Sequence, residues 1–431
     1  MRSVAVATLG CKVNSYDSQA LLAQFAQEGY EVVDFRDFAT VYVVNTCCVT
    51  NLADKKSRQI IGRARQKNPQ AIVVAMGCAS QSDSQKYTKL DVDIIAGTTE
   101  RAKILDYINE YNGTQIVAVK SDILQEKTFE VQAGEFESNR TRAFLKIQDG
   151  CSNFCSYCVI PYARGGSRSR NFDDLMAQAH AFADAGYKEI VVAGIHVASY
   201  GKDLQEYGLV DVLAKIAKIP KIARVRLSSV EPMAITAEFC DFMSANPKFC
   251  NHLHLSLQSG SNAVLEAMKR RYDTYAFERS VEDLRTASPD INITTDLIAG
   301  FPGESDAEHQ KSLDFAKKIG FSKLHVFPFA PKEKTAAAKM QNQIAKNIKQ
   351  NRAKELLALS DELEKKYYEK FIGKTMPVLI EESNKNNYAI GKTMNYIDLR
   401  FENCNAELEN EIVDVEVISI SKGGMVGLLK K

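Results

Sequence analysis

Apolar residues follow two different spacings along the first quarter of the chain. Short apolar runs of strand length are separated by longer stretches in which apolar side chains recur every three or four positions, as on one face of a helix. Strands that alternate with helices in this way are typical of a parallel sheet covered by helices. We therefore predict an α/β fold with an open parallel sheet over residues 1–112. Its predicted strands are Ser3–Thr8, Val41–Asn45, Ala71–Ala75 and Asp93–Ala96, and its predicted helices cover 17–28, 53–67 and 101–111.

The alternation stops over residues 113–140, which we predict to be a linker, and a second α/β series covers residues 141–330. Six strand–helix units in one run predict a partial (β/α)6 barrel that is open on one side. The predicted strands are Ala143–Gln148, Glu189–Ala193, Arg224–Ser228, His252–Leu257, Ile291–Ile298 and Lys323–Phe327. Helices are predicted over 172–186, 236–245, 261–269, 276–287 and 305–319.

The remainder of the chain changes character twice. Residues 331–370 are predicted to form a basic helical connector. Over residues 371–431 the pattern switches to short segments with alternating apolar and polar positions, which is typical of a small all-β barrel. The predicted strands of this barrel are Met376–Glu381, Tyr388–Lys392, Ile397–Phe401 and Ile412–Ile420.

Composition is that of an ordinary globular protein with two or three domains. The chain has 431 residues, of which 45% are hydrophobic and 25% charged. No apolar run approaches the ~18 residues that span a membrane, and the apolar segment after Met1 is too short for a signal-peptide core. We therefore expect a cytoplasmic protein without membrane contact. The ten cysteines of such a chain are better explained by metal ligation or catalysis than by disulfides.

Charge is unevenly distributed, although the formal net charge is only +1. Residues 54–67 carry six Lys or Arg against one acid, and residues 332–354 carry seven against one acid. Such runs are usually solvated helix faces and favour RNA binding only weakly.

Cys151, Cys155 and Cys158, here called the barrel cysteines, follow the first predicted barrel strand. Barrels of this type place their chemistry on such loops. Three thiolates can hold a 4Fe–4S cluster and leave one iron open, and this CxxxCxxC spacing resembles that of radical S-adenosylmethionine (SAM) enzymes. A structural zinc site normally needs four ligands, and the nearest histidine, His180, lies well beyond the loop. A disulfide is disfavoured by the compartment and by the odd number of thiols.

Cys11, Cys47 and Cys78, here called the sheet cysteines, each follow a predicted strand of the N-terminal sheet. Because ligands of open parallel sheets bind at the carboxyl ends of the strands, these thiols are expected to converge. Gly10 and Gly77 allow the sharp exit that this requires. One such cysteine could be a small buried hydrophobe, but three at equivalent positions favour a second 4Fe–4S cluster. The remaining cysteines, predicted to be ordinary core or surface residues, are Cys48, Cys240, Cys250 and Cys404.

Both cysteine sets, the barrel and the C-terminal β module together resemble the methylthiotransferase family of radical SAM enzymes. The resemblance covers essentially the whole chain, and the C-terminal module would correspond to the family's OB-like TRAM domain. Within the family, the loop Gly10–Asn14 and the segment Asn51–Gln59 resemble the MtaB-type subgroup. Further matching stretches are Gly150–Arg164, Arg226–Pro232, Leu255–Ser261 and Thr294–Glu304.

The resemblance implies an enzyme that converts N6-threonylcarbamoyladenosine at position 37 of tRNA into its 2-methylthio derivative. Its implied cofactors are SAM and two 4Fe–4S clusters. The cluster of the barrel cysteines would cleave SAM to a radical that abstracts hydrogen from carbon 2 of the adenine. The cluster of the sheet cysteines would hold the sulfur that is methylated and transferred. Implied partners are the tRNA anticodon stem-loop, an electron donor such as a flavodoxin-type reductase system, and a sulfur source.

Six residues are candidates for contact with SAM because of their positions on or after barrel strands. Tyr157 could meet the adenine, and Gly194 would allow close approach of the methionyl end. For each of the polar candidates, packing or capping inside the barrel is an equally good explanation. His196, nearby, is predicted to be a hydrogen-bonded strand-end histidine rather than a catalytic group. The polar candidates are Ser228, Glu231, Gln258 and Asp296.

Two features depart from the family pattern. Cys48 stands where the family usually has threonine. Residues 372–431 carry seven Lys or Arg against nine Asp or Glu, although the family's TRAM domain is taken to bind RNA. Phosphate contacts are therefore expected more from residues 54–67 and 332–354 than from this module.

Three alternatives stay open. Two are family members that act on isopentenyladenosine in tRNA or on an aspartate of a ribosomal protein, and the loop Gly10–Asn14 argues against both. The third is a non-enzymatic iron–sulfur or zinc protein that binds RNA. Two three-ligand sites with open coordination argue against it, because structural metal sites tend to be closed.

Overall fold

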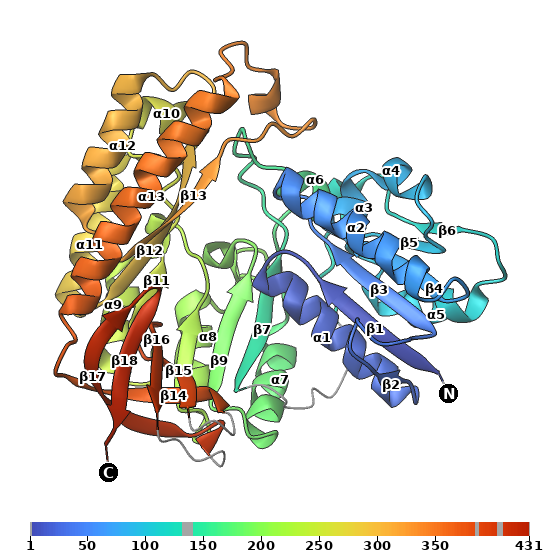
Figure 1. Ribbon diagram of the computed structural model, residues 1–431, viewed down its shortest axis with the longest axis horizontal. Helices are drawn as coiled ribbons and strands as arrows, with labels where there is room; N and C mark the ends of the chain where they lie inside the picture. Colours follow the sequence, from blue (N-terminus) through green and yellow to red (C-terminus); the bar gives the residue numbers. More distant parts are fainter. Residues whose placement is uncertain (1, 132–140, 384–387, 403–407, 431) are drawn as a thin grey trace.

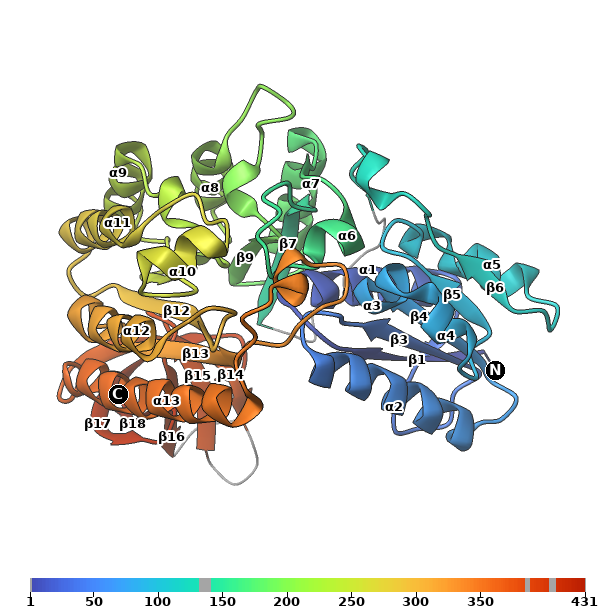
Figure 2. The ribbon, with the colours of Figure 1, turned by 90° about the horizontal axis from the view of Figure 1, so that it is seen from above.

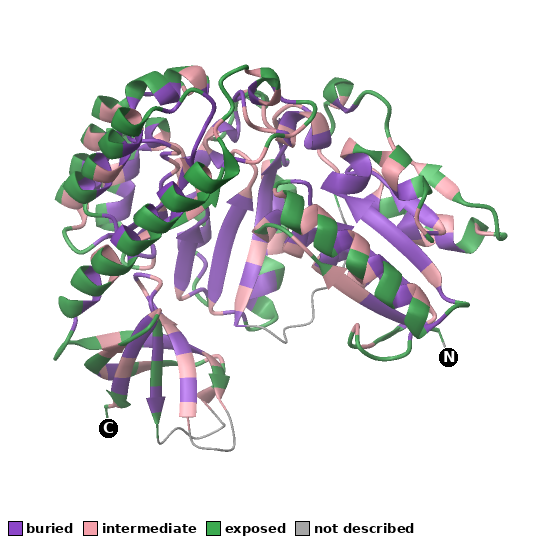
Figure 3. Ribbon diagram, turned by 45° about the horizontal axis from the view of Figure 1, so that its top comes forward, coloured by how far each residue is buried: buried purple, intermediate pink, exposed green. Residues whose placement is uncertain are grey.

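The computed structural model describes residues 2–131, 141–383, 388–402 and 408–430. A sheet domain and a partial barrel lie side by side, and a small closed barrel packs against one end of the partial barrel (Figure 1). Seen from above, helices cover the outside of both larger units (Figure 2). The strands between them are largely buried, whereas the helices expose their outer faces (Figure 3). The predicted α/β class with three such units is confirmed.

The N-terminal sheet is entirely parallel, with the strand order β2-β1-β3-β4-β5-β6. Apolar side chains fill both of its faces, which explains the near-continuous apolar sequence of its central strands. The strands are β1 (Ser3–Thr8), β2 (Glu31–Val32), β3 (Val41–Thr46), β4 (Ile72–Gly77), β5 (Ile94–Ala96) and β6 (Ile116–Ala118). The helices are α1 (Lys12–Gln27), α2 (Asn51–Lys67), α3 (Cys78–Ser82), α4 (Ser84–Thr88) and α5 (Ile104–Glu110), with the 3-10 turns η1 (Arg101–Lys103) and η2 (Ile123–Gln125).

Strand β6 comes from residues 113–140, where the sequence predicts only a linker. It pairs in parallel with β5 at the edge of the sheet. Three residues at an edge, none of them fully buried, are too few to produce a recognisable apolar alternation. Residues 132–140 of this segment lie outside the described residues.

The central unit has six parallel strands in sequence order. Regular strand pairing is interrupted between the third and fourth strands, β10 and β11. Only isolated bridges join the chain there, between Val225 and Phe249 and between Val230 and Leu255. A short antiparallel strand, β8 (Arg168–Ser169), flanks β7, and among the described strands none joins β7 to β13. The predicted partial barrel, open on one side, is thereby confirmed. Its strands are β7 (Arg142–Asp149), β9 (Glu189–Gly194), β10 (Arg224–Leu227), β11 (His252–His254), β12 (Asn292–Ala299) and β13 (Lys323–Pro328).

Helices cover the outside of these strands. Two of them, α6 (Ile160–Arg164) and α8 (Leu209–Ala217), were not among the predicted helices. Helix α13 (Lys346–Glu369) packs along β13 through Ala353, Leu356 and Leu359. The helices are α6 (Ile160–Arg164), α7 (Phe172–Asp184), α8 (Leu209–Ala217), α9 (Ala237–Ala245), α10 (Asn262–Ala267), α11 (Thr274–Ala287), α12 (Asp306–Ile319) and α13 (Lys346–Glu369). The 3-10 turns are η3 (Val197–Ser199), η4 (Pro232–Ala234) and η5 (Ala336–Lys339). No helix in the described part of the chain is long and apolar enough to cross a membrane.

The C-terminal strands close into a barrel in the order β14-β15-β16-β18-β17, which confirms the predicted small β barrel. The last strand was missed because Gly424 and Gly427 interrupt its apolar pattern. A Cβ at Gly427 would lie 2.5 Å from Val415 Cγ1, so the close approach of the strands requires glycine there. The strands are β14 (Thr375–Ser383), β15 (Tyr388–Thr393), β16 (Asp398–Glu402), β17 (Ile412–Ser421) and β18 (Gly424–Leu429).

A buried network of charges joins the sheet domain to the partial barrel. Lys146 Nζ lies 2.9 Å from Asp17 and 2.6 Å from Asp149. Arg164 contacts the same two carboxylates at 3.2 Å and 2.8 Å, and Arg101 contacts both as well. Since Asp17 and Arg101 belong to the sheet domain and the others to the barrel, the network orients one unit against the other. Removal of one partner from such a network leaves a buried charge uncompensated.

The small barrel packs against the end of the partial barrel at which β10, β11 and β12 begin. Arg224 donates to the carbonyl oxygens of Lys392 and Pro377 at 2.7 Å and 2.9 Å. The ring of His252 stacks on Tyr396 with centroids 4.8 Å apart. The barrel cysteines lie at the opposite end, after β7.

Candidate active site

The barrel cysteines lie on the loop between β7 and α6. The amide of Cys151 donates to Gly165 O at 3.0 Å, and the amide of Cys158 donates to Cys155 O at 2.9 Å. Gly150 precedes the loop with φ +71°, and a Cβ there would lie 1.9 Å from Gly166 O. No other residue fits that turn without moving the loop. All three cysteines line one cavity of about 150 Å³.

Arg270, which sequence reasoning did not select, lies beside these thiols. Its guanidinium donates to Cys155 Sγ at 3.2 Å and to Glu231 Oε1 at 2.8 Å. Burial raises the pKa of Cys151 to about 11 and that of Cys158 to about 12, so both thiols hold their protons at neutral pH until a metal displaces them. A cationic guanidinium beside Cys155 suits a cluster that carries net negative charge.

Glu231 is the carboxylate of this cavity and has three partners. His196 Nε2 lies 3.1 Å from one of its oxygens, and Asn153 Nδ2 lies 3.2 Å from the other, which also accepts from Arg270. Burial by itself would raise the pKa of Glu231, but the hydrogen bond with His196 and the charge of Arg270 lower it to about 2. The group is therefore an anion throughout the physiological range. His196 lines the same cavity and is hydrogen-bonded to Glu231, and its structural role stays a prediction.

The six candidate SAM contacts are placed differently from one another. Tyr157, Glu231 and Gln258 line the cavity with the barrel cysteines. Gly194 and Ser228 precede Ile195 and Ser229, which line it.

One of these positions shows a feature that suits a bound ligand, and Asp296 does not line the cavity. A Cβ at Gly194 would lie 3.0 Å from Val197 Cγ1 and 3.1 Å from Gln148 O, so close packing within the chain explains this glycine. Ser228 Oγ is buried without a hydrogen-bond partner among the described residues. An unsatisfied buried hydroxyl of this kind is expected beside a polar ligand. Asp296 instead pairs with His254, whose Nε2 lies 3.3 Å from its Oδ2.

The sheet cysteines converge at the carboxyl ends of β1, β3 and β4. A Cβ at Gly10 would lie 3.1 Å from Cys47 Sγ, which shows how closely the first two loops approach. Burial, followed by the nearby Cys78 and Cys11 thiols, raises the pKa of Cys47 to about 11. Burial also raises the pKa of Cys11, against the opposing charge of Arg164. The three thiols thus lie close enough to affect one another, with Cys47 and Cys78 buried and Cys11 at the surface, although they are far apart in the sequence.

Arg164 connects this environment to the barrel. Its Nε donates to Cys78 Sγ at 3.1 Å, while Nη2 donates to Asn14 Oδ1 at 2.6 Å. The side chain is fully buried and comes from α6, directly after the loop of the barrel cysteines. Each cysteine set therefore has one arginine against one of its sulfurs. Arg164 carried no local signal, because its sulfur partner lies 86 residues away in the sequence.

Cys48 is not the isolated core residue that the sequence predicts. It is buried, but its thiol donates to Cys78 and accepts from Ser82 Oγ at 3.8 Å. The hydrogen bond from Cys48 and the charge of Arg164 lower the pKa of Cys78 to about 6, against the effect of burial. The consecutive side chains of Cys47 and Cys48, directly after β3, are both buried. Cys250 is buried and Cys240 half-buried, and Cys404 lies outside the described residues.

Neither cysteine set is arranged for a single ion. The described residues contain no group of three or more His, Cys, Asp or Glu side chains placed to hold one metal ion. A 4Fe–4S cluster lies between its thiolates and holds them further apart than one ion does. The barrel cysteines line one cavity with Arg270, and the sheet cysteines have Arg164 against one sulfur. Three thiols beside a guanidinium fit such a cluster better than they fit zinc.

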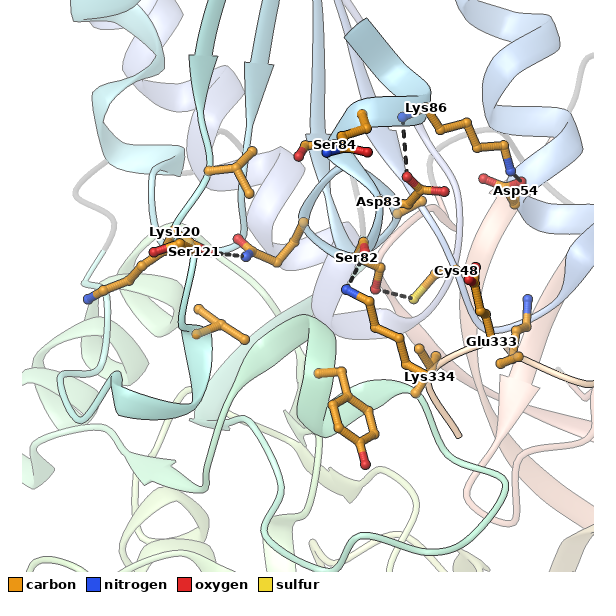
Figure 4. Close-up of a pocket in the computed structure, with 18 of the residues that line it drawn as sticks. Cys48, Asp54, Ser82, Asp83, Ser84, Lys86, Lys120, Ser121, Glu333 and Lys334 are labelled. Carbon is orange, nitrogen blue, oxygen red and sulfur yellow. Dashed lines mark hydrogen bonds and ion pairs between the residues drawn. The ribbon is translucent and has the colours of Figure 1, made fainter. Parts of the chain in front are cut away.

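A second cavity, of about 1020 Å³, opens beside Cys48 (Figure 4). Lys334 Nζ donates to Ser82 O at 2.6 Å, and Lys332 Nζ donates to Asn51 Oδ1 at 2.8 Å. These contacts join the segment after β13 to the start of α2 and the end of α3. The basic stretch 332–354 therefore reaches this cavity through Lys332, Lys334 and Lys339, whereas the stretch 54–67 lines it with its one acid, Asp54.

Comparison with known proteins agrees with this architecture. A family model described as "Uncharacterized protein family UPF0004" matches residues 3–97, and a model of the radical SAM superfamily matches residues 145–316. The solved structure of the radical SAM methyltransferase TsrM from Kitasatospora setae superposes with a TM-score of 0.56 and 16% identity. It covers 78% of this chain and 75% of that one, and it shows the fold alone.

Two curated relatives extend over nearly the whole chain. The threonylcarbamoyladenosine tRNA methylthiotransferase MtaB of Bacillus subtilis is 40% identical over 425 residues, which cover 97% of this chain and 94% of the relative. The tRNA-2-methylthio-N(6)-dimethylallyladenosine synthase of Clostridium botulinum is 32% identical over 435 residues, with 98% and 94% covered.

Fold, barrel loop and superfamily match define a radical SAM enzyme. With both domains present and full-length relatives at this identity, the chain belongs to the methylthiotransferase family of these enzymes. It is a transferase whose cofactors are SAM and two 4Fe–4S clusters.

Proposed function

We propose that this enzyme transfers a methylthio group to carbon 2 of N6-threonylcarbamoyladenosine at position 37 of tRNA. The observation that carries the proposal is the convergence of two separate cysteine sets next to one domain interface, each with its own buried arginine. The substrate follows from the name of the Bacillus subtilis relative, which is 40% identical over 97% of this chain.

The barrel cysteines are proposed to hold the cluster that binds SAM, and the sheet cysteines to hold the second cluster. When bound, these cofactors supply the radical that activates carbon 2 and the methylthio group that replaces its hydrogen. Arg270 and Arg164 offset the negative charge of the thiolates. Because both guanidinium groups are buried and multiply bonded, they need no reorganisation when the ligands ionise.

The residues around the barrel cysteines would bind and orient SAM. Glu231 stays ionised and can accept from the amino group of SAM or hold Arg270 in place. Ser228 Oγ offers a hydrogen bond that the chain itself leaves unused among its described residues. Tyr157 and Gln258 line the same cavity, and Gly194 directly precedes Ile195, which also lines it. Asp296 is proposed to act further from SAM, through His254.

The charge network at the domain interface would keep the two cysteine sets at a constant separation. Asp17 lies on α1, directly after the loop of Cys11, and Asp149 directly precedes the loop of Cys151. Lys146 and Arg164 bind both carboxylates. Positioning of this kind is what a reaction between two separately held groups requires.

Partners and location complete the proposal. The anticodon stem-loop would bind across the open side of the barrel, with lysines from both basic stretches near its phosphates. An electron donor, such as a flavodoxin-type reductase system, and a sulfur source are needed by the chemistry. Since tRNA modification takes place where tRNA is found, we place the enzyme in the cytoplasm.

Mass spectrometry of tRNA nucleosides from cells that lack this protein tests the proposal. We expect the loss of 2-methylthio-N6-threonylcarbamoyladenosine and accumulation of its unmethylthiolated precursor, while 2-methylthio-dimethylallyladenosine stays. The 32% identical relatives named for the dimethylallyl substrate make that base the second candidate. Loss of the dimethylallyl product alone would transfer the assignment to it, and no change in either product would refute a role in tRNA.

A further inference from the structure

Four cations face the ring of Tyr396, at the junction of all three structural units. Arg226 and Arg142 from the partial barrel lie 4.4 Å and 5.6 Å from the ring centroid. Lys392 of the small barrel lies at 4.5 Å, and Lys12 of the sheet domain lies at 5.7 Å. Such a concentration of positive charge around one phenol ring needs carboxylates to balance it.

Three of these cations have carboxylate partners. Arg226 pairs with Glu189 at 2.7 Å and Arg142 pairs with Glu381 at 2.6 Å. Lys392 pairs with Asp398. Among the described residues, no carboxylate lies within ion-pair distance of Lys12, which is half-buried and faces the phenol ring of Tyr396. The positive charge that remains unbalanced at this junction is therefore the ammonium of Lys12.

The internal contact of this ammonium among the described residues is the ring of Tyr396. Lys12 directly follows Cys11, yet the group that contacts the sheet cysteines is Arg164, at 3.1 Å from Cys78 Sγ. The Lys12 side chain extends instead toward Tyr396, whose ring it shares with three other cations. A partly desolvated ammonium without a counter-ion costs free energy unless an anion arrives with a ligand. Lys12 is half-buried, so part of its surface stays accessible.

We propose that Lys12 binds the carboxylate of the threonylcarbamoyl group and makes the enzyme specific for that substituent. This inference rests on the proposed function. The threonylcarbamoyl substituent carries one carboxylate at neutral pH, whereas a dimethylallyl substituent is an uncharged hydrocarbon. Carbon 2 of the base must approach the sheet cysteines, and Lys12, at the first position of α1, lies next to Cys11. The N6 substituent of a base held there would find its counter-charge within the same loop.

Specificity follows from what the ammonium would lack with the wrong base. A site that leaves a desolvated charge unpaired rejects an analogue far more strongly than a merely apolar pocket does. A dimethylallyl group bound at this place would leave Lys12 without a counter-ion. Lys12 is thus a specificity-determining residue, distinct from the groups that hold the cofactors.

Binding of anticodon stem-loops by the complete, cluster-loaded enzyme tests this inference at one fixed salt concentration. The wild-type enzyme should bind the threonylcarbamoyl stem-loop about tenfold or more tightly than the same RNA with its carboxylate converted to a neutral amide. Lys12→Gln should bind both RNAs alike, at the weaker affinity. Lys12→Arg should restore most of the difference, since it restores the charge.

Lys392→Gln is the matched control, because Lys392 faces the same ring but is paired with Asp398. It should keep the discrimination between the two RNAs. Iron content and SAM cleavage without RNA should be unchanged in Lys12→Gln, since Lys12 holds neither cofactor. If Lys12→Gln fails to fold, the comparison of the two RNAs on the wild-type enzyme still decides, because equal affinities would overturn the inference.

The outcomes separate this inference from the proposed function. If the wild-type enzyme methylthiolates the threonylcarbamoyl stem-loop and Lys12→Gln still discriminates against the amide, Lys12 is not the specificity residue, while the function stands. If Lys12→Gln weakens both RNAs by the same factor, the ammonium contacts a backbone phosphate, and the carboxylate contact is refuted. If the wild-type enzyme modifies only the dimethylallyl stem-loop, the proposed function itself fails.

Discussion

At the scale of single residues, buried arginines decide the electrostatics of both cysteine sets. Arg164 and Arg270 each place a guanidinium against one sulfur and at least one carboxylate. Arginine keeps its charge when buried and can satisfy several acceptors at once, so it suits a site where thiolates and carboxylates are crowded. Each arginine therefore allows neighbouring anions to exist in a place from which water is largely excluded.

The two cysteine sets should separate in function. Cys151→Ala and Cys11→Ala each remove one proposed ligand, so iron in the reconstituted enzyme should fall from about eight to about four atoms per chain in either variant. Cys151→Ala should release no 5′-deoxyadenosine from SAM, whereas Cys11→Ala should release it without inserting sulfur into tRNA. Iron analysis and chromatography of the products measure both effects. Normal iron content in either variant would remove that cysteine from the ligand set.

Glu231 should make stability depend on pH in a defined window. Its pKa is lowered to about 2, so the stability that its ionised form contributes is present above pH ~4.5 and is lost as the pH falls toward 2. The full contribution is on the order of 3 kcal/mol. Glu231→Gln should therefore be destabilised at neutral pH, with a difference from wild type that shrinks below pH ~4.5. Urea unfolding of the iron-free proteins measures this, and Glu282→Gln, an exposed glutamate of α11, should show no comparable difference.

At the scale of elements, the exits of parallel strands determine where the cysteines go. Gly10 and Gly77 have φ angles of +109° and +103°, and each directly precedes a sheet cysteine. A left-handed residue turns the chain sharply from a strand into a helix, which brings the next side chain back over the sheet edge. The two turns therefore direct Cys11 and Cys78 toward each other.

Substitution at one of these turns should affect the second cluster selectively. A Cβ at Gly77 would lie 2.5 Å from Asn45 Oδ1 and 2.9 Å from Thr46 O. Gly77→Ala should cost roughly 2 kcal/mol or more in unfolding free energy and lower the iron content by displacing Cys78. Gly62→Ala, in the interior of α2 where nothing lies within 4 Å of a Cβ, should instead stabilise by about 0.5–1 kcal/mol. Thermal unfolding with iron analysis distinguishes the two, and an unchanged iron content in Gly77→Ala would contradict the argument.

At the scale of the whole molecule, contacts between distant segments assemble the site. The charge network joins α1 and η1 to β7 and α6, and the small barrel closes the opposite end through Tyr396. Lys332 and Lys334 connect the segment after β13 to the sheet domain. The open side of the barrel and the two cysteine sets are thereby held in one arrangement, with lysines nearby for a polyanion.

Those lysines should contribute to RNA affinity without selecting the base. Lys332→Ala with Lys334→Ala should weaken threonylcarbamoyl, unmodified and dimethylallyl stem-loops by similar factors. It should also reduce the slope of log affinity against log salt by about one for each lost phosphate contact. Titrations at several salt concentrations measure this. The same charge change in Lys365→Ala with Lys366→Ala, on the exposed end of α13, should have little effect, and equal losses in both pairs would point to general charge attraction alone.

Much of this protein is determined by patterns within short stretches of its sequence. The strands of the sheet and the barrel follow from apolar runs and their spacing, and the loop of Cys151, Cys155 and Cys158 is recognisable because its residues are neighbours in the chain. Where the pattern was short or interrupted, as in β6 and in β18 with its two glycines, it predicted no element. Local sequence carries these features because each depends on residues a few positions apart.

Only the tertiary structure decided which side chains meet across long distances. The contact of Arg164 with Cys78, the hydrogen bond of Cys48 to Cys78 and the surplus charge of Lys12 all depend on how segments distant in the sequence pack. None of these leaves a periodic or compositional trace, since an arginine that will be buried against a thiol 86 residues away looks like any other arginine in the sequence. The chain alone thus determined its elements and its iron–sulfur chemistry, while packing decided the electrostatics that act on that chemistry.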